Sequence, residues 1–298
     1  MNGVINIYKE RGFTSQDVVA KLRGILRQKK IGHTGTLDPD ALGVLPVCVG
    51  NATKLFDILT DRTKEYETVL LLGKNTDTQD ISGEVIMESN KWQELSENEV
   101  TDVIMSFLPG YDQIPPMYSA LKVNGKKLYE LAREGKEVER QPRRVDIDNI
   151  EIVDITLPRV TMRLSVSKGT YIRTICNDIG DRLGCYGCME KLIRTRAGSF
   201  TIDDALTLSE VEKIRDEGKL DEILVKVDDL FDYTKLHMRP ETDKAVHNGN
   251  VFFSRDTVEN INKPNKGYYL VYDSSDVFMG IYEYITNERR YKPYKMFL

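Results

Sequence analysis

The apolar positions of the chain follow the period of strands in some segments and the period of helices in others. Segments 3–9 and 66–73 have strand patterns, and the second is an almost continuous apolar run, which predicts a strand buried on both faces. Segments 14–28 and 96–108 each open with a capping box, Thr14 with Asp17 and Ser96 with Glu99, followed by apolar residues at helical spacing. Alternating runs at 145–155 and 160–169 predict two strands, and a helix is expected from about 171 to 183.

The order of these elements predicts the fold class. Strands and helices are interleaved, but neighbouring strands look like hairpins rather than repeated βαβ units, which favours an α+β fold with a mixed, largely antiparallel central sheet flanked by helices. After about residue 233 the pattern changes to short β-like runs separated by turn residues. We therefore expect two domains, residues 1–235 and a small all-β domain at 236–298.

Composition narrows the class of protein. None of the apolar runs reaches 18 residues, so no membrane span is predicted, and the first residues lack a secretion signal, so a cytoplasmic protein is expected. The four cysteines are too scattered for a disulfide scaffold, and the pair Cys185 and Cys188 lacks the second pair that a structural zinc site needs. We expect reduced cysteines and no metal. The net charge of −5 argues weakly against nucleic acid as a partner.

The charge distribution qualifies that last point. Residues 122–144 hold eight basic residues and four glutamates, within an acidic protein. A solvated helix with paired charges and a mobile basic flap that follows a phosphate backbone both fit this composition. The preceding segment, "YDQIPPMYSA", adds two prolines and two tyrosines, which suits a surface that contacts bases.

Two further segments carry candidate chemistry. Asp38 lies in "GHTGTLDPDALGVLPV", where an ordinary turn residue is the simpler interpretation. Arg173 lies in "SKGTYIRTI", where a strand ends and a helix begins. This arginine could be a surface charge, a phosphate clamp, or the partner that keeps a buried carboxylate ionised. Asp38 is the candidate carboxylate, but nothing in the pattern brings the two residues together.

Four segments in order, "GHTGTLDPDALGVLPVCVGNATKL", "KEYET", "PPMYSALKVNGKKLYELAREG" and "SKGTYIRTI", closely resemble the bacterial TruB family of tRNA pseudouridine synthases. The resemblance spans most of residues 1–235. It implies a pseudouridine synthase fold and a cofactor-free isomerase that acts on the T-loop uridine of tRNA, at position 55. Such an enzyme breaks the N–C1′ bond, turns the uracil, and rejoins it to the ribose through C5.

The resemblance also implies roles for single residues. By motif match, Asp38 is the nucleophilic aspartate, Arg173 is the arginine that pairs with it, and Tyr66 is the tyrosine that stacks on the target base and is expected to assist proton transfer at C5. The remaining matches are binding residues: the wedge His33 that holds the T-loop open, Tyr171 in the pocket, the apolar Leu192 in a looser motif, and Lys54 as a phosphate contact or ion pair. Asp40 departs from the family motif, and we expect it to face solvent.

RNA contacts are expected from two further regions. The insert at about 110–144 resembles a tRNA clamp whose candidate contacts are Lys122, Lys126, Lys127, Arg143 and Arg144. The last 63 residues resemble a PUA-like RNA-binding domain, with a dimerisation or structural β domain as the alternative. The predicted partner is the T-arm of tRNA, bound by a monomer without an obligate protein partner. A non-catalytic RNA chaperone and a guide-RNA-dependent relative are the alternative functions.

Overall fold

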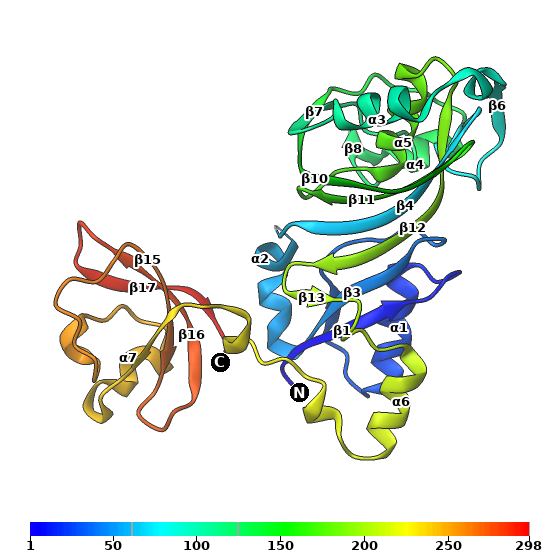
Figure 1. Ribbon diagram of the computed structural model, residues 1–298. Helices are drawn as coiled ribbons and strands as arrows, with labels where there is room; N and C mark the ends of the chain where they lie inside the picture. The colour runs from blue at the N-terminus through cyan, green and yellow to red at the C-terminus, as the bar shows by residue number, and fades with distance from the viewer. Residues whose placement is uncertain (61, 124, 298) are drawn as a thin grey trace.

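The computed structural model describes residues 1–60, 62–123 and 125–297, and a mixed sheet forms its centre (Figure 1). Within that part of the chain the sheet has nine strands: the path β1-β3-β12-β4-β11-β10-β7, with β2 paired to β3 and β13 paired to β12. Only the β3–β12 pair is parallel. The strands are β1 (Gly3–Lys9), β2 (Ile31–His33), β3 (Leu42–Val49), β4 (Lys64–Leu72), β7 (Gly110–Gln113), β10 (Arg143–Thr156), β11 (Arg159–Val166), β12 (Gly187–Ala197) and β13 (Phe200–Thr201). The predicted mixed, largely antiparallel sheet is confirmed.

Helices cover the two halves of this sheet in different places (Figure 1). The helices α1 (Ser15–Ile25) and α6 (Leu208–Asp216) pack on β1 and β3. The helices α3 (Glu97–Met105) and α5 (Ile172–Arg182) cover β4, β10, β11 and β12. The shorter helices are α2 (Phe56–Thr60), α4 (Leu128–Arg133) and α7 (Asp243–His247), and the 3-10 turns are Gly50–Leu55, Lys91–Glu94, Leu220–Glu222, Asp228–Leu230, Pro240–Thr242 and Ser254–Asp256.

The locally specified elements form as predicted. The Thr14 side chain accepts from the Asp17 amide at the start of α1, and Ser96 accepts from the Glu99 amide at the start of α3. Every second residue of β11, from Val160 to Val166, is buried. Both features depend only on short-range pattern, which explains why the sequence was sufficient.

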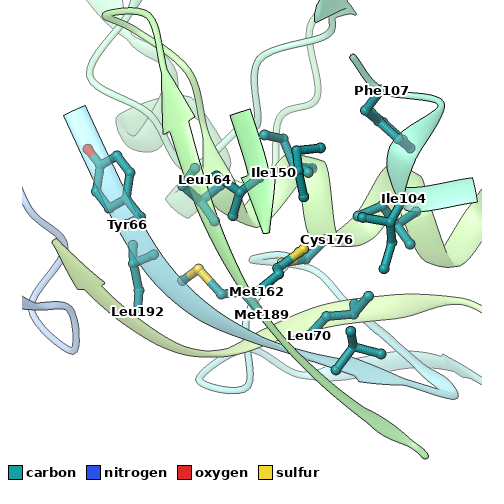
Figure 2. Close-up of a cluster of buried hydrophobic side chains, with 14 of the residues drawn as sticks. Tyr66, Leu70, Ile104, Phe107, Ile150, Met162, Leu164, Cys176, Met189 and Leu192 are labelled. Carbon is teal, nitrogen blue, oxygen red and sulfur yellow. The ribbon is translucent and has the colours of Figure 1, made fainter. Parts of the chain in front are cut away.

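The prediction that segment 66–73 is buried on both faces is wrong. Along β4 buried residues alternate with half-buried ones: Tyr66, Leu70 and Leu72 join the core under α3 and α5 (Figure 2), whereas Glu67 lies on the other face. There it accepts a hydrogen bond from Arg163 of β11 at 2.9 Å. The strand is central in the sheet, but its second face is partly open to solvent and carries ion pairs.

The C-terminal residues form a separate four-stranded sheet, in the order β14 (Thr234–His237), β15 (Gly267–Tyr272), β16 (Phe278–Ile285) and β17 (Arg290–Met296). Its residues Leu270 and Ile281 share an apolar cluster with Val4 and Val44 of the central sheet. Two small hairpins complete the fold, β5 (Lys74–Thr76) with β6 (Val85–Glu88), and β8 (Lys122–Val123) with β9 (Lys126–Lys127). In the described part of the chain, none of the helices combines the length and apolar character needed to cross a bilayer.

Candidate active site

The loop that carries Asp38 runs from β2 to β3 and is fastened on both sides of the aspartate. Its neighbours Leu37 and Ala41 are buried in the core. The Leu37 amide donates to Ser15 Oγ at 2.8 Å, and the Ser15 hydroxyl lies 3.2 Å from the Leu37 carbonyl. The loop is therefore anchored by apolar burial and by α1, so that the Asp38 carboxylate is held at a defined place.

Two buried cations, Lys9 and Arg194, which the sequence analysis did not identify, donate hydrogen bonds to the backbone of the same loop and its flanking strand. Lys9 is fully buried at the end of β1, and its ammonium donates to the Pro39 carbonyl at 2.9 Å and to the Phe13 carbonyl at 2.6 Å. Burial lowers the pKa of this lysine to about 8. Arg194 of β12 donates to the Val44 carbonyl at 2.6 Å and to the Gly35 carbonyl at 3.3 Å, and thus binds both ends of the loop. Nothing in the local sequence pattern distinguishes either cation from a surface charge.

Arg173 lies in the first turn of α5 and meets Asp38 across 135 residues of sequence. Its Nε lies 3.1 Å from Asp38 Oδ2, and its Nη1 lies 3.7 Å from a carboxylate oxygen of Asp80. The same guanidinium donates to the carbonyls of Thr78 and Tyr118 at 3.2 and 3.0 Å. Only 7% of the arginine side chain is exposed. Of the three roles left open by the sequence, the structure favours the partner of a carboxylate, and it adds Asp80 as a second, unpredicted carboxylate.

The surroundings of Asp38 act on its charge in opposite directions. Burial of the carboxyl raises its pKa, the Arg173 guanidinium lowers it, and the nearby Asp80 raises it. The net effect is a pKa above the usual value for aspartate. With 40% of its side chain exposed, Asp38 lies at the rim of the site, where a substrate can reach it.

Tyr66 and Leu192 lie in the apolar core cluster on the sheet (Figure 2). Tyr66 projects from β4 and Leu192 from the neighbouring β12, and both belong to the cluster that also contains Leu37 and Ala41. Each is less than a tenth exposed. The two predicted apolar site residues therefore belong to the same core cluster as Leu37 and Ala41, which flank Asp38 in sequence.

Tyr171 is the residue immediately before α5, two positions before Arg173. The Gln113 side chain fixes its backbone, because Gln113 Oε1 accepts from the Tyr171 amide at 2.9 Å and Gln113 Nε2 donates to the Tyr171 carbonyl at 3.1 Å. Burial raises the pKa of the Tyr171 hydroxyl, and the charges of Arg173 and Arg143 oppose that effect. Arg143 pairs with Gln113 in the β10–β7 register. Tyr171 and Arg143 thus lie on the Arg173 side of the site.

His33 lies in β2, opposite Val47 of β3. Burial and the charge of Arg194 lower the pKa of the His33 ring, so the ring favours its neutral form. Its Nδ1 is buried without a hydrogen-bond partner among the described residues. Asp40 faces solvent, as expected, and forms an ion pair with Arg11 at 3.1 Å.

Other predicted binding residues lie apart from Asp38. Lys54 donates to the Met296 carbonyl at 2.8 Å, which places it against the C-terminal strand β17. The cations of the insert are on its surface: Lys126 lies 3.5 Å from Glu134, Lys127 donates to the Tyr129 hydroxyl at 3.2 Å, and Lys122 and Arg144 are exposed. The insert folds as the β8–β9 hairpin and α4, so both a short helix and a basic surface are present.

The cysteines are buried in the core. All four are free thiols and buried, and burial raises the pKa of Cys188 to about 11. Among the described residues, histidine, cysteine, aspartate and glutamate do not gather in groups of three that could hold a metal ion. Of the C-x-x-C pair, Cys185 belongs to the apolar cluster under α5, and Cys188 is buried in β12.

Comparisons with known proteins show the family of this chain. The model of the N-terminal domain of the TruB family of pseudouridylate synthases matches residues 23–172, and the model of the tRNA pseudouridylate synthase B C-terminal domain matches residues 173–232. The tRNA pseudouridine synthase B of Lachnoclostridium phytofermentans is 53% identical over 309 residues, covering 100% of both chains. The enzyme of the same name from Bacillus pumilus is 41% identical, covering 99% of this chain and 97% of its own.

Two solved structures share the fold. A chain of an H/ACA RNP bound to a substrate RNA containing 2′-deoxyuridine is 22% identical with a TM-score of 0.72, and a chain of a Cbf5-Nop10-Gar1 complex is 24% identical with a TM-score of 0.73. Each alignment covers 99% of this chain and 85% of the other. The predicted fold class, with its central mixed sheet and C-terminal β domain, is thereby confirmed.

Proposed function

Because this chain belongs to the TruB family of tRNA pseudouridine synthases, we propose that it isomerises the uridine at position 55, in the T-loop of tRNA, to pseudouridine. The contact between Asp38 and the buried Arg173 is the observation that carries this proposal, and Tyr66 and Leu192 belong to the core cluster that includes the neighbours of Asp38 in the loop. An ionised carboxylate held by a buried guanidinium at the edge of an apolar core suits covalent catalysis on a base that has been taken out of its stack.

Asp38 acts as the nucleophile in this proposal, and the bond that its carboxylate forms with C1′ or with C6 breaks again before the product leaves, which regenerates the carboxylate. The N1–C1′ bond breaks, the detached uracil turns within the site, and a C5–C1′ bond forms. The C5 proton then leaves, and N1 gains a proton, so that product and substrate have the same composition. Asp38 must be ionised at the start, and the guanidinium of Arg173 favours this form against the cost of burial.

The neighbouring side chains bind and orient the base. Tyr66 stacks on the flipped uracil and assists the removal of the C5 proton, while Leu192 closes the apolar side and Tyr171 lines the opposite side. Apolar walls exclude water, which limits hydrolysis of a covalent intermediate. His33 is the wedge that keeps the T-loop open, and its neutral ring enters between bases at a smaller desolvation cost than a charged one.

RNA binding is assigned to surfaces outside this pocket. The exposed cations Lys122, Lys126, Arg143 and Arg144 and the half-buried Lys127 contact the phosphates of the T-arm. Folded RNA offers little readable sequence, so the shape of the T-arm and the flipped base determine specificity. We propose that the chain works as a monomer, without cofactor, metal or obligate protein partner.

The test uses purified protein, a synthetic T-arm hairpin and a chelator, without guide RNA. Pseudouridine mapping should find the product at position 55 alone, and a hairpin with cytidine at that position should yield none. Hairpin folding that improves without any pseudouridine would favour a chaperone, and activity that appears only after guide RNA is added would favour a guide-dependent enzyme. Either result would overturn the proposed function.

A further inference from the structure

A groove of about 420 Å³ lies between helix α2 and the C-terminal sheet, away from the residues of the Asp38 site. We call it the junction groove, and its lining is Asp57, Ile58, Arg62, Tyr233, Tyr268, Ile281 and Tyr294. Its walls come from α2, from Arg62 and Tyr233, and from the strands β15, β16 and β17 of the C-terminal sheet, which Figure 1 shows near the C-terminus. None of the residues assigned to catalysis lines it, so the catalytic proposal leaves this groove unexplained.

Aromatic rings form a continuous row along the groove. Phe231 stacks on Tyr233 with ring centres 5.1 Å apart and planes 15° apart. Tyr233 lies 5.7 Å from Tyr268, and Tyr268 lies 4.7 Å from Tyr294. Tyr294, at the end of the row, is 42% exposed. Rings at these distances pack on one another, so the exposed ring of Tyr294 is the member of the row that can receive a planar group from solvent.

A cation lies at each end of this row. The Arg62 guanidinium is 5.8 Å from the Phe231 ring centre, and the Lys295 ammonium is 5.7 Å from that of Tyr294. Lys295 is also 3.3 Å from Asp57, so part of its charge is already compensated. Lys54 fastens the adjoining backbone by donating to the Met296 carbonyl at 2.8 Å. The junction groove is therefore a fixed aromatic surface with modest positive charge at its ends.

We propose that the junction groove binds unpaired nucleotides of RNA by stacking a base on Tyr294, at the end of the tyrosine row. Every base has a ring face, so such a surface accepts single strands with little sequence preference. The terminal cations can approach the flanking phosphates, which favours RNA over an uncharged proline-rich peptide as the occupant. The inference shares with the proposed function only the premise that the ligand is RNA, because no catalytic residue takes part.

The small number of cations at the junction groove predicts how RNA binding there depends on salt concentration. Phosphate-dominated binding loses affinity steeply as salt rises, in proportion to the number of phosphates contacted. The junction groove has few cations and one is paired, so its binding should have a shallower salt slope than the binding of a T-arm hairpin to the basic insert. A slope equal to that of the hairpin would contradict stacking as the main interaction.

The experiment measures fluorescence anisotropy of a labelled octa-adenylate, which contains neither uridine nor a hairpin. Tyr294→Ala should weaken binding about fivefold or more, since one stacked base contributes about 1 kcal/mol or more. Tyr294→Phe keeps the ring and should bind like the wild type. Phe253→Ala is the matched control, because Phe253 is a similarly exposed ring of the C-terminal region with its own cation, Arg255, at 5.1 Å.

A competition experiment tests whether the octa-adenylate and the T-arm hairpin bind at different sites. An unlabelled T-arm hairpin should leave the bound octa-adenylate in place, and Tyr294→Ala should form pseudouridine in the hairpin at the wild-type rate. Displacement by the hairpin, equal binding by wild type and Tyr294→Ala, or binding of an oligoproline peptide but no RNA would each overturn the proposal. If the oligonucleotide fails to bind while the hairpin is still modified, this inference falls and the proposed function stands.

Discussion

Replacing Arg173 by methionine should move the acid limb of the activity profile to higher pH. The guanidinium is the main group that opposes the raised pKa of Asp38, so its loss raises that pKa further. Asp38 must be ionised to act, and a larger fraction is protonated at any given acidic pH in the variant. The acid limb of the pH–activity profile therefore shifts to higher pH and not to lower pH.

The contact geometry sets the size of this shift. A unit charge about 4 Å away contributes about 1 kcal/mol in water and about 4 kcal/mol at an effective dielectric constant of about 20. The closest contact between Arg173 and Asp38 is 3.1 Å, but 40% of the Asp38 side chain is exposed, so solvent screening places the effect near the lower end of that range. We expect a shift of about one pH unit, because one pKa unit corresponds to about 1.4 kcal/mol.

Single-turnover pseudouridine formation on the T-arm hairpin, measured from about pH 5 to 9, reports the limb directly. The position of the limb does not depend on the amount of folded enzyme, which protects the result from partial loss of the Thr78 and Tyr118 contacts. Arg173→Lys keeps the charge and should show a smaller shift. Arg163→Met, which removes an exposed ion pair with Glu67, is the matched control. An unshifted limb in Arg173→Met would refute the electrostatic account.

Three further predictions concern the support of the site and the RNA surface. The free energy of unfolding of the wild type, relative to that of Lys9→Met, should rise between about pH 8 and the ordinary lysine pKa. In this range the buried Lys9 of the folded chain has lost its proton, whereas Lys9 of the unfolded chain still holds it. Denaturant titrations of both proteins at pH 8 and pH 10 check this, and a difference that does not change with pH contradicts it. Gly43→Ala should lower the melting temperature, because Gly43 has a φ of +100° and a Cβ there would lie 2.2 Å from the Arg194 carbonyl oxygen; Gly125→Ala, where a Cβ meets no neighbour, is the control for positive φ and should cost less. Charge reversal in the insert is made at Lys122, Lys126, Lys127, Arg143 and Arg144. It should weaken hairpin binding and reduce the slope of log affinity against log salt by about one per lost phosphate contact, as binding titrations at several salt concentrations would show.

Short-range pattern predicted much of the fold. The capping boxes at Thr14 and Ser96 specify helix starts through contacts within four residues, and the alternation of β11 records which face meets the core. The error at β4 has a physical cause. Its apolar run contains residues such as Val69 that lie half-buried on the face of the Arg163–Glu67 ion pair, and hydrophobicity alone does not reveal that this face is only partly buried.

The candidate site depended on long-range placement. The motifs led to Asp38 and Arg173, but only the fold joins residues 135 positions apart. Lys9, Asp80 and Arg194 were missed because a charge becomes informative only once its burial and its partners are known. Lys54 shows the opposite kind of error. It was predicted as a site residue because it lies in a specific motif, but its side chain donates to the Met296 carbonyl at the junction between the two sheets.

Asp38→Asn tests the central claim most directly, because it removes the charge and keeps the shape of the side chain. Purified wild type and variant are incubated with the T-arm hairpin at matched concentrations, and pseudouridine at position 55 is mapped beside a hairpin-binding titration. The account predicts product from the wild type, none from the variant, and hairpin affinity that differs by less than about threefold, since Asp38 contributes to chemistry rather than to phosphate binding. Product from Asp38→Asn at a rate near that of the wild type would contradict the account.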